Sequence, residues 1–195
     1  MKLLMRVGAA LAALPLVTAA ASAEPARFEI DPQHLSIVFN VEHLGYGAVW
    51  GLFLTGSGSF TYDEEARELS DLRVEIDTTS VFSNDEARDG HLRSGDFLDA
   101  EAHPVATFVM TGAEPQSETT GTVTGDLTLR GETHPVTLDV TLNKIGPYPW
   151  GENYVVGITA TTTLKRSEWG STYAVEDNLV GDEVPLTIEL EAIRQ

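Results

Sequence analysis

Apolar and polar residues alternate with a period of two along most of the chain after residue 27. The clearest cases are residues 72–77, 136–142, 154–164 and 184–192. Because successive side chains of a β-strand point to opposite faces, each segment is expected to be a strand with one buried face. Weaker alternation predicts further strands at residues 28–43, 49–62, 105–110 and 123–129. The turn-forming residues 31–34 are expected to interrupt the first of these.

The predicted strands are long and are joined mostly by short turns, which indicates antiparallel pairing of neighbours. About eight antiparallel strands with one apolar face form either a closed barrel or a two-layer sandwich. Strands of roughly ten or more residues that bend at glycines, as at Gly56 and Gly58, suit the tilted strands of a barrel better. We therefore predict an all-β fold, an eight-stranded antiparallel barrel.

Residues 84–99 lack this alternation and are predicted to form a short helical segment followed by a turn. Asn84 is a suitable N-cap, and Asp85 and Glu86 would place negative charge in the first helical turn, where the helix dipole favours it. Gly90 should keep the helix short. The many charged residues of this segment are expected to pair with one another or with loop backbone.

Residues 1–23 have the composition of a secretory signal peptide. Lys2 and Arg6 precede an apolar run, and Ala21-Ser22-Ala23 suits cleavage after its last residue. The run is shorter than the roughly 20 residues that a membrane-spanning helix needs, so we expect an exported chain, residues 24–195, without stable membrane insertion. That length suits one domain. An uncleaved N-terminal anchor is the alternative.

The formal net charge is −18, and removal of Lys2 and Arg6 would make the mature chain more acidic. Nucleic acid and anionic lipid headgroups would be repelled, so neither is an expected partner. The sequence has no cysteine and no GxSxG motif, which removes the two commonest signs of a nucleophile. We expect no enzyme activity, although an acid–base pair assembled across the barrel stays open as an alternative.

Motifs spread over the mature chain resemble those of the YceI family. They include His43-Leu44-Gly45, the segment RDGHLRS from Arg88 to Ser94, Asp96-Phe97, His103-Pro104, Gly125-Asp126-Leu127-Thr128 and Arg166-Ser167-Glu168-Trp169-Gly170. The resemblance implies a lipocalin-like barrel exported to the bacterial periplasm, with a long internal channel for a polyisoprenoid chain. It implies an isoprenoid or quinone-like lipid as ligand, and no cofactor. Leu98, His103 and Trp169 depart from the residues common in the family, which bears on ligand size more than on fold.

Residues on the predicted inward faces are candidates for the wall of this channel. They are Phe39, Val41, His43, Val49, Phe53, Val74, Ile76, Phe97, Phe108, Met110, Val140, Val156, Ile158 and Trp169. Positions without bulk leave space in a strand, so Gly51 and Gly157 are expected to favour a free interior over a filled one.

Arg88, His91 and Arg93 are candidates for binding a phosphate headgroup at the barrel mouth. The alternative, which the sequence slightly favours, is that both arginines form ion pairs with the neighbouring Asp89, Asp96 and Asp99. A metal bound by these histidines and carboxylates is a weaker interpretation, because their spacing matches no common motif. We therefore expect no metal.

Taken with the resemblance, these patterns predict an exported protein that carries or sequesters a long isoprenoid or related lipid. One alternative is a structural or stress-response protein with a filled core. Another is a hydrolase or isomerase that acts on such a lipid. A homodimer is a further partner that the sequence leaves open.

Overall fold

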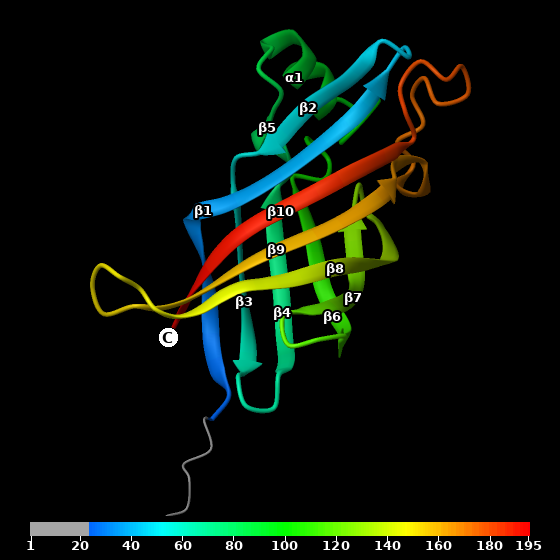
Figure 1. Cartoon of the computed structure of the whole chain (residues 1–195). Coiled ribbons are helices and arrows are strands. Elements are labelled where there is room, and N and C mark those ends of the chain that lie inside the picture. The colour runs from blue at the N-terminus through cyan, green and yellow to red at the C-terminus, as the bar shows by residue number, and fades with distance from the viewer. Residues whose placement is uncertain (1–23) are drawn as a thin grey trace, which may run out of the picture.

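The computed structural model describes residues 24–195, and its strands form one continuous antiparallel sheet (Figure 1). The strands are β1 (Ala26–His43), β2 (Gly47–Phe53), β3 (Gly56–Asp63), β4 (Glu68–Asp77), β5 (Val81–Phe82), β6 (Val105–Pro115), β7 (Thr120–Leu129), β8 (Glu132–Pro147), β9 (Tyr154–Lys165) and β10 (Glu183–Arg194). The helices are α1 (Glu86–Arg93) and the 3₁₀ turns η1 (Thr78–Ser80) and η2 (Arg166–Trp169).

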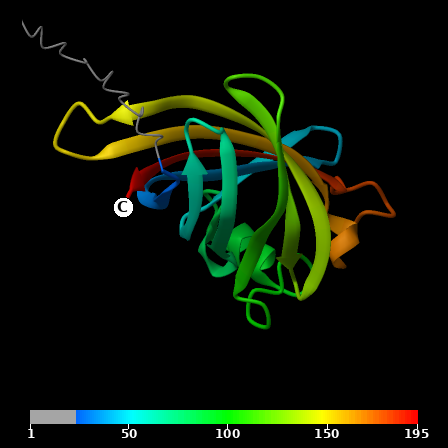
Figure 2. The same ribbon diagram turned by 90° about the horizontal axis from the view of Figure 1, so that it is seen from below.

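Pairing of β1 with β10 closes the sheet into a barrel of eight strands, in the order β1, β3, β4, β6, β7, β8, β9 and β10. Strands β2 and β5 lie outside this ring and continue the sheet beside the second half of β1. In Figure 2 the sheet curves back on itself, so that β3 and β4 face β8, β9 and β10. The predicted eight-stranded antiparallel barrel with a short helical segment is therefore confirmed.

Strand β1 is longer than predicted because residues 31–34 do not end it. They form an irregularity in the pairing with β10, between Ile30 and Leu35, and the strand then resumes. The first part of β1 pairs with β3 and the last part pairs with β2. The strand therefore bends where an interruption was predicted, and its two parts pair with different strands, β3 and β2.

The predicted strand 49–62 is divided into β2 and β3 by a bend at Leu54 and Thr55. The backbone N–H groups of both residues donate to Ser80, at 3.2 Å and 3.1 Å, which fixes the bend. Gly58 then passes close to β4, because a Cβ atom there would lie 2.6 Å from the carbonyl oxygen of Arg73. Only a residue without a side chain can approach the neighbouring strand this closely.

Two apolar clusters fill parts of the barrel. One lies near the start of β1, contains Phe28, Ile30, Phe60, Val156 and Ala192, and includes a stacked Phe28–Phe60 pair with ring centroids 5.5 Å apart. We call this the closed end. The other contains Phe108, Val123, Val136, Leu164 and Trp169. Within residues 24–195 none of the helices has the length and hydropathy to cross a membrane.

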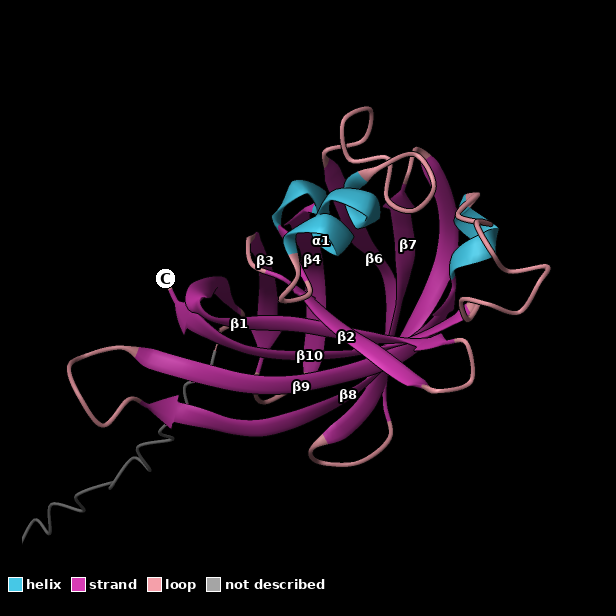
Figure 3. Cartoon of the chain, turned by 90° about the horizontal axis from the view of Figure 1, so that it is seen from above, coloured by secondary structure: helices cyan, strands magenta, loops and turns pink. Residues whose placement is uncertain are grey.

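Helix α1 lies over the other end of the barrel, which we call the α1 end (Figure 3). Its N-cap is Asp85, whose side chain accepts a hydrogen bond from the backbone N–H of Arg88 at 2.9 Å. The predicted cap, Asn84, is one residue too early, because Asn84 has a left-handed backbone (φ 64°) that turns the chain into the helix. The helix ends at Arg93, three residues after Gly90.

Candidate ligand-binding site

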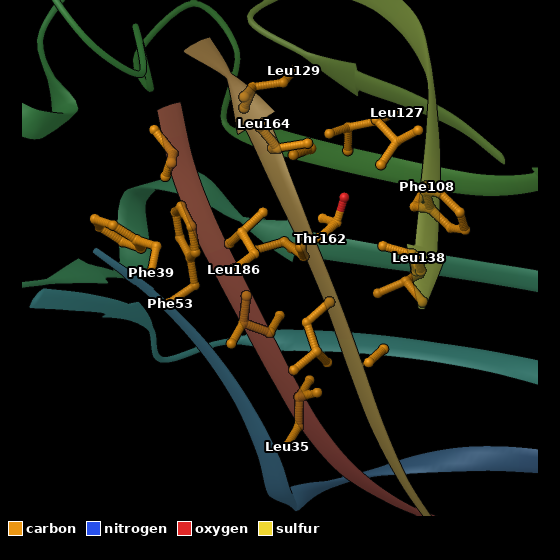
Figure 4. A pocket seen from close by; sticks show the side chains of 18 of the residues that line it. Leu35, Phe39, Phe53, Phe108, Leu127, Leu129, Leu138, Thr162, Leu164 and Leu186 are labelled. Atoms are coloured by element: carbon orange, nitrogen blue, oxygen red, sulfur yellow. The ribbon is translucent and has the colours of Figure 1, made fainter. Parts of the chain in front are cut away.

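The interior of the barrel holds a cavity of about 230 Å³ between the closed end and the α1 end (Figure 4). A single water needs roughly 10 to 15 Å³ on a comparable measure, so this space is not a packing defect. Every strand of the closed barrel contributes inward side chains to the wall. The alternative of a filled core does not hold for this part of the barrel.

Strand β9 shows how alternation builds the wall. Ile158, Ala160, Thr162, Leu164 and the following Arg166 all line the cavity. At roughly 3.3 Å per residue, the positions from Ile158 to Leu164 within β9 extend over about 20 Å, so the cavity is long rather than round. The small side chains of Ala160 and Thr162 leave the middle of this strand without bulk.

The two glycines expected to leave free space do not do so. A Cβ atom at Gly51 would lie 2.4 Å from Cζ of Phe39, so the ring of Phe39 fills that gap. Gly157 alternates with Val156 and Ile158, and a Cβ atom there would lie 4.0 Å from Cβ of Asn143 and 4.0 Å from the carbonyl oxygen of Lys144. The space comes instead from the diameter of the barrel and from small inward residues.

Most of the predicted channel residues lie on the cavity wall. They are Phe39, Val41, Phe53, Val74, Ile76, Phe97, Phe108, Val140, Ile158 and Trp169. Four others lie elsewhere. His43 is exposed at the end of β1, Val49 is half-buried on β2, Met110 packs against the second apolar cluster, and Val156 lies in the closed-end cluster. Alternation places them on the inward face, but the cavity does not extend that far along their strands.

None of the three predicted headgroup residues lines the cavity. The guanidinium of Arg88 donates to the hydroxyl (2.8 Å) and the carbonyl oxygen (2.5 Å) of Ser83. The carboxylate of Asp89, which is buried, accepts from the backbone N–H and the hydroxyl of the same serine. Among residues 24–195 neither Arg88 nor Arg93 forms an ion pair, so the expected pairing with neighbouring carboxylates is wrong.

His91 lies on the exposed side of the α1 end. Its Nε2 is 2.9 Å from Oδ2 of Asp96, and its ring meets the rings of Phe97 and Tyr173 edge-on, with centroids 4.9 Å and 5.1 Å away. Asp99 and His103 form a separate, longer contact of 3.9 Å. In the described part of the chain no three His, Asp or Glu side chains are grouped closely enough to hold a metal ion.

Sequence reasoning missed two arginines that border the cavity at its α1 end. The side chain of Arg166 is buried and donates to four carbonyl oxygens, those of Ser171, Tyr173, Val180 and Gly181, at 2.8 to 2.9 Å. Arg130 similarly donates to carbonyl oxygens of Phe97 (2.5 Å), Gly95 (3.1 Å) and Trp169 (3.0 Å).

Burial lowers the pKa of Arg166 from its ordinary value, because desolvation disfavours the charged form. The nearby carboxylate of Asp182 acts in the opposite direction. A signal for Arg166 is present in the sequence, since it continues the inward positions of β9. The carbonyl groups that bind it belong to loops, and alternation says nothing about those.

The N–H groups of both guanidinium groups donate to backbone carbonyl oxygens rather than to the cavity. The exposed wall of the cavity is entirely apolar. The indole N–H of Trp169 is likewise directed to the carbonyl oxygen of Leu127, at 3.2 Å. The cavity can therefore surround a slender apolar chain, and it offers that chain no polar partner.

A closed antiparallel barrel of eight strands around a long apolar cavity is the architecture of lipocalin-like proteins. Residues 28–192 match the model of the YceI-like domain, and the chain belongs to this family. It is 37% identical to a UPF0312 protein of Pseudomonas putida (strain W619) over 195 residues, which cover 99% of this chain and 100% of the relative. It is 42% identical to a UPF0312 protein of Pseudomonas savastanoi pv. phaseolicola over 165 residues, 82% of this chain and 85% of the relative.

Solved structures show the same fold. The crystal structure of the YceI protein of Campylobacter jejuni has a TM-score of 0.72 and 30% identity, with 79% of this chain and 90% of that chain covered. A polyisoprenoid binding domain from Saccharophagus degradans, implicated in plant cell wall breakdown, has a TM-score of 0.61. Its identity is 15%, with 88% of this chain and 100% of that chain covered, so this likeness concerns the fold alone.

Proposed function

We propose that this protein binds one long isoprenoid or related lipid in the barrel and carries or sequesters it without chemical change. The observation that carries the proposal is the long cavity with a wholly apolar exposed wall. An apolar chain gains about 0.8 kcal/mol for each CH₂ group that leaves water. The total affinity is smaller than the sum, because ordering a flexible chain costs free energy. The Saccharophagus degradans domain, which shares this fold, is a polyisoprenoid binding domain.

This interior selects a ligand by width and length more than by headgroup. A polar headgroup would find no unused donor or acceptor along the cavity wall, and burying it there without a partner would cost free energy. The headgroup is therefore expected to stay at the α1 end or outside the barrel. The same lack of polar groups disfavours a hydrolase or isomerase, which would need an acid or base beside the bound lipid.

The test is organic extraction of protein purified from a bacterial host that makes isoprenoids, followed by mass spectrometry of the extract. We expect an isoprenoid or other long-chain lipid in near-stoichiometric amount. An extract without lipid, from protein that also fails to bind a polyprenol added afterwards, would overturn the proposal.

We also propose that the chain acts after export, in the periplasm, and that residues 1–23 are removed as a signal peptide. The signal lies outside the described residues, so its support is the sequence pattern alone. The intact mass of protein from a periplasmic fraction should correspond to a chain that begins at Glu24. Recovery of the full chain from Met1 in the membrane pellet would contradict this.

A further inference from the structure

Large apolar side chains are exposed at the α1 end of the barrel, on two neighbouring loops. Tyr46 is 92% exposed and Trp50 is 63% exposed, and both belong to the β1–β2 hairpin. Leu44 from the same hairpin, and Tyr173 and Leu179 from the segment before β10, are each more than two-fifths exposed. We call these five residues the rim.

The two loops of the rim are fastened together. The backbone N–H of Leu44 donates to the carbonyl oxygen of Leu179 at 2.9 Å, and the N–H of Gly181 donates to the carbonyl oxygen of Glu42 at 2.9 Å. His43 and Val180 also form an isolated antiparallel bridge. Figure 1 shows the hairpin and the segment before β10 side by side at this end. The rim is therefore one surface rather than two separate loops.

The rim adjoins the end of the cavity. Val41 lines the cavity and lies two residues before His43, and Ser171 lines it two residues before Tyr173. Arg166, also on the wall, holds the carbonyl groups of Tyr173 and Val180. The exposed apolar surface of the rim therefore lies next to this end of the cavity.

We propose that the rim docks the barrel on the surface of a zwitterionic phospholipid bilayer, from which the cargo enters the cavity. This inference rests on the proposed function, because a long isoprenoid resides in a bilayer when it is not bound to protein. Tyr and Trp are the side chains that favour the headgroup region of a bilayer, with an apolar ring and a polar edge. Exposed apolar surface of this kind marks an interaction site.

The negative charge of the protein favours a neutral bilayer over an anionic one. The chain carries a formal net charge of −18, and the rim has acidic neighbours in Glu42, Glu176 and Asp177. No Lys or Arg lies between residues 28 and 66 or between residues 167 and 193. An anionic bilayer would repel such a surface, whereas a neutral one would not. A second copy of this acidic chain on the same rim would be repelled for the same reason.

The rim can be tested with phosphatidylcholine vesicles, first without cargo and then with a small fraction of a long-chain polyprenol. The variant is Tyr46→Ser with Trp50→Ser. The matched control is Trp150→Ser, because Trp150 is 77% exposed in the β8–β9 loop at the other side of the molecule (Figure 1). Cosedimentation gives vesicle affinity, and the rate of polyprenol transfer to the protein gives cargo entry.

We expect wild type and the control to bind neutral vesicles and to acquire polyprenol at the same rate. The double variant should bind about tenfold more weakly or worse and should acquire polyprenol correspondingly more slowly. Vesicles with added phosphatidylglycerol should bind wild type less well. The amount of polyprenol bound at equilibrium should be the same in all three proteins.

Equal vesicle affinity of the double variant and wild type would overturn the rim proposal and leave the proposed function intact. So would a concentration-dependent dimer, lost only in the double variant, without vesicle binding by wild type. Failure of wild type to bind polyprenol by any route would overturn the proposed function and with it the entry of cargo, whereas vesicle binding that still depends on the rim would retain the docking of the rim on the bilayer.

Discussion

Arg166 and Arg130 show how positive charge is kept beside an apolar cavity. Arg130 is surrounded by backbone carbonyl oxygens from two segments far from it in the sequence, near residues 95–97 and at Trp169. The carbonyl partners of Arg166 all belong to the segment 171–181 that follows it. Carbonyl dipoles satisfy the N–H donors without adding a second charge that would itself need partners. The consequence is structural, because Arg166 fastens the segment 171–181 to the end of β9 and Arg130 joins residues 95–97 to Trp169.

Replacement of Arg166 by Met should destabilise the fold by about 3 to 5 kcal/mol, since carbonyl groups of four residues would lose their buried partner at once. Chemical denaturation measures this. The control is Arg73→Ala, which removes an exposed pair with Glu75 and should cost less than about 1 kcal/mol. Similar losses for the two variants would contradict the role given to Arg166.

His34 and Asp31 lie at the irregularity of β1, with Nδ1 and Oδ2 2.7 Å apart. This hydrogen bond raises the pKa of His34, and the same bond, with that from the N–H of Gln33, lowers the pKa of Asp31. The contribution of His34 to stability is present below its unfolded pKa of about 6.5 and is lost as pH rises through its higher folded pKa. That of Asp31 is present above about 3.9 and is lost as pH falls through its lower folded pKa.

An NMR titration of the His34 ring in the Asp31→Asn variant should therefore give a lower pKa than in wild type. Glu191→Gln should lower it less, because that carboxylate is 3.9 Å away and acts by charge alone. A pKa of His34 that is unchanged by Asp31→Asn would show that the contact is absent in solution.

At the scale of elements, the segment from Ser83 to α1 is held by a network of hydrogen bonds rather than by ion pairs. Asp89 accepts two hydrogen bonds from Ser83, and Arg88 donates two hydrogen bonds to Ser83. The rest of the segment reaches the barrel through Arg130, which binds the carbonyl groups of Gly95 and Phe97. This explains how a short helix with few apolar residues stays in place over the α1 end.

Asp89→Ala should cost about 2 to 4 kcal/mol of stability, because two buried donors of Ser83 would lose a charged acceptor. Asp85→Ala on the same helix removes only the N-cap and should cost about 1 kcal/mol. Denaturation of both variants measures the difference. Equal losses of stability would contradict the role given to Asp89.

We also expect a chelator to leave the melting temperature unchanged, since the described residues contain no cluster of three His, Asp or Glu side chains that could hold a metal ion.

Alternation in the sequence predicted the strands and their inward faces well, because each side chain has only two directions to choose from. It failed where the structure depends on contacts between distant segments. The bend between β2 and β3 is set by Ser80, and the partners of Arg88 are atoms of Ser83 rather than the nearby carboxylates. Composition cannot tell a guanidinium that binds carbonyl groups from one that binds an acid.

At the scale of the whole molecule, the barrel is filled at one end and hollow in the middle. Phe28 and Phe60 stack at the closed end, while small residues such as Ala160 face the cavity. The sequence indicated which residues face inward, but not which of these residues pack against one another. Gly51 illustrates the limit, since its missing side chain makes room for Phe39 rather than for a ligand.

The central claim is that the cavity holds the lipid, and two substitutions on neighbouring positions of β9 test it most directly. Ala160 is buried on the cavity wall, whereas Thr161 is exposed on the outer face. Ala160→Phe should place a ring in the cavity at an overpacking cost of no more than about 1 to 3 kcal/mol, and Thr161→Phe should add the same ring outside.

The measurement is the amount of lipid extracted from each folded protein after expression in the same host, with cooperative unfolding as the check on folding. We predict equal recovery from wild type and Thr161→Phe, and a loss of most of the lipid from Ala160→Phe. Undiminished recovery from a folded Ala160→Phe protein would contradict the claim that the lipid lies inside the barrel.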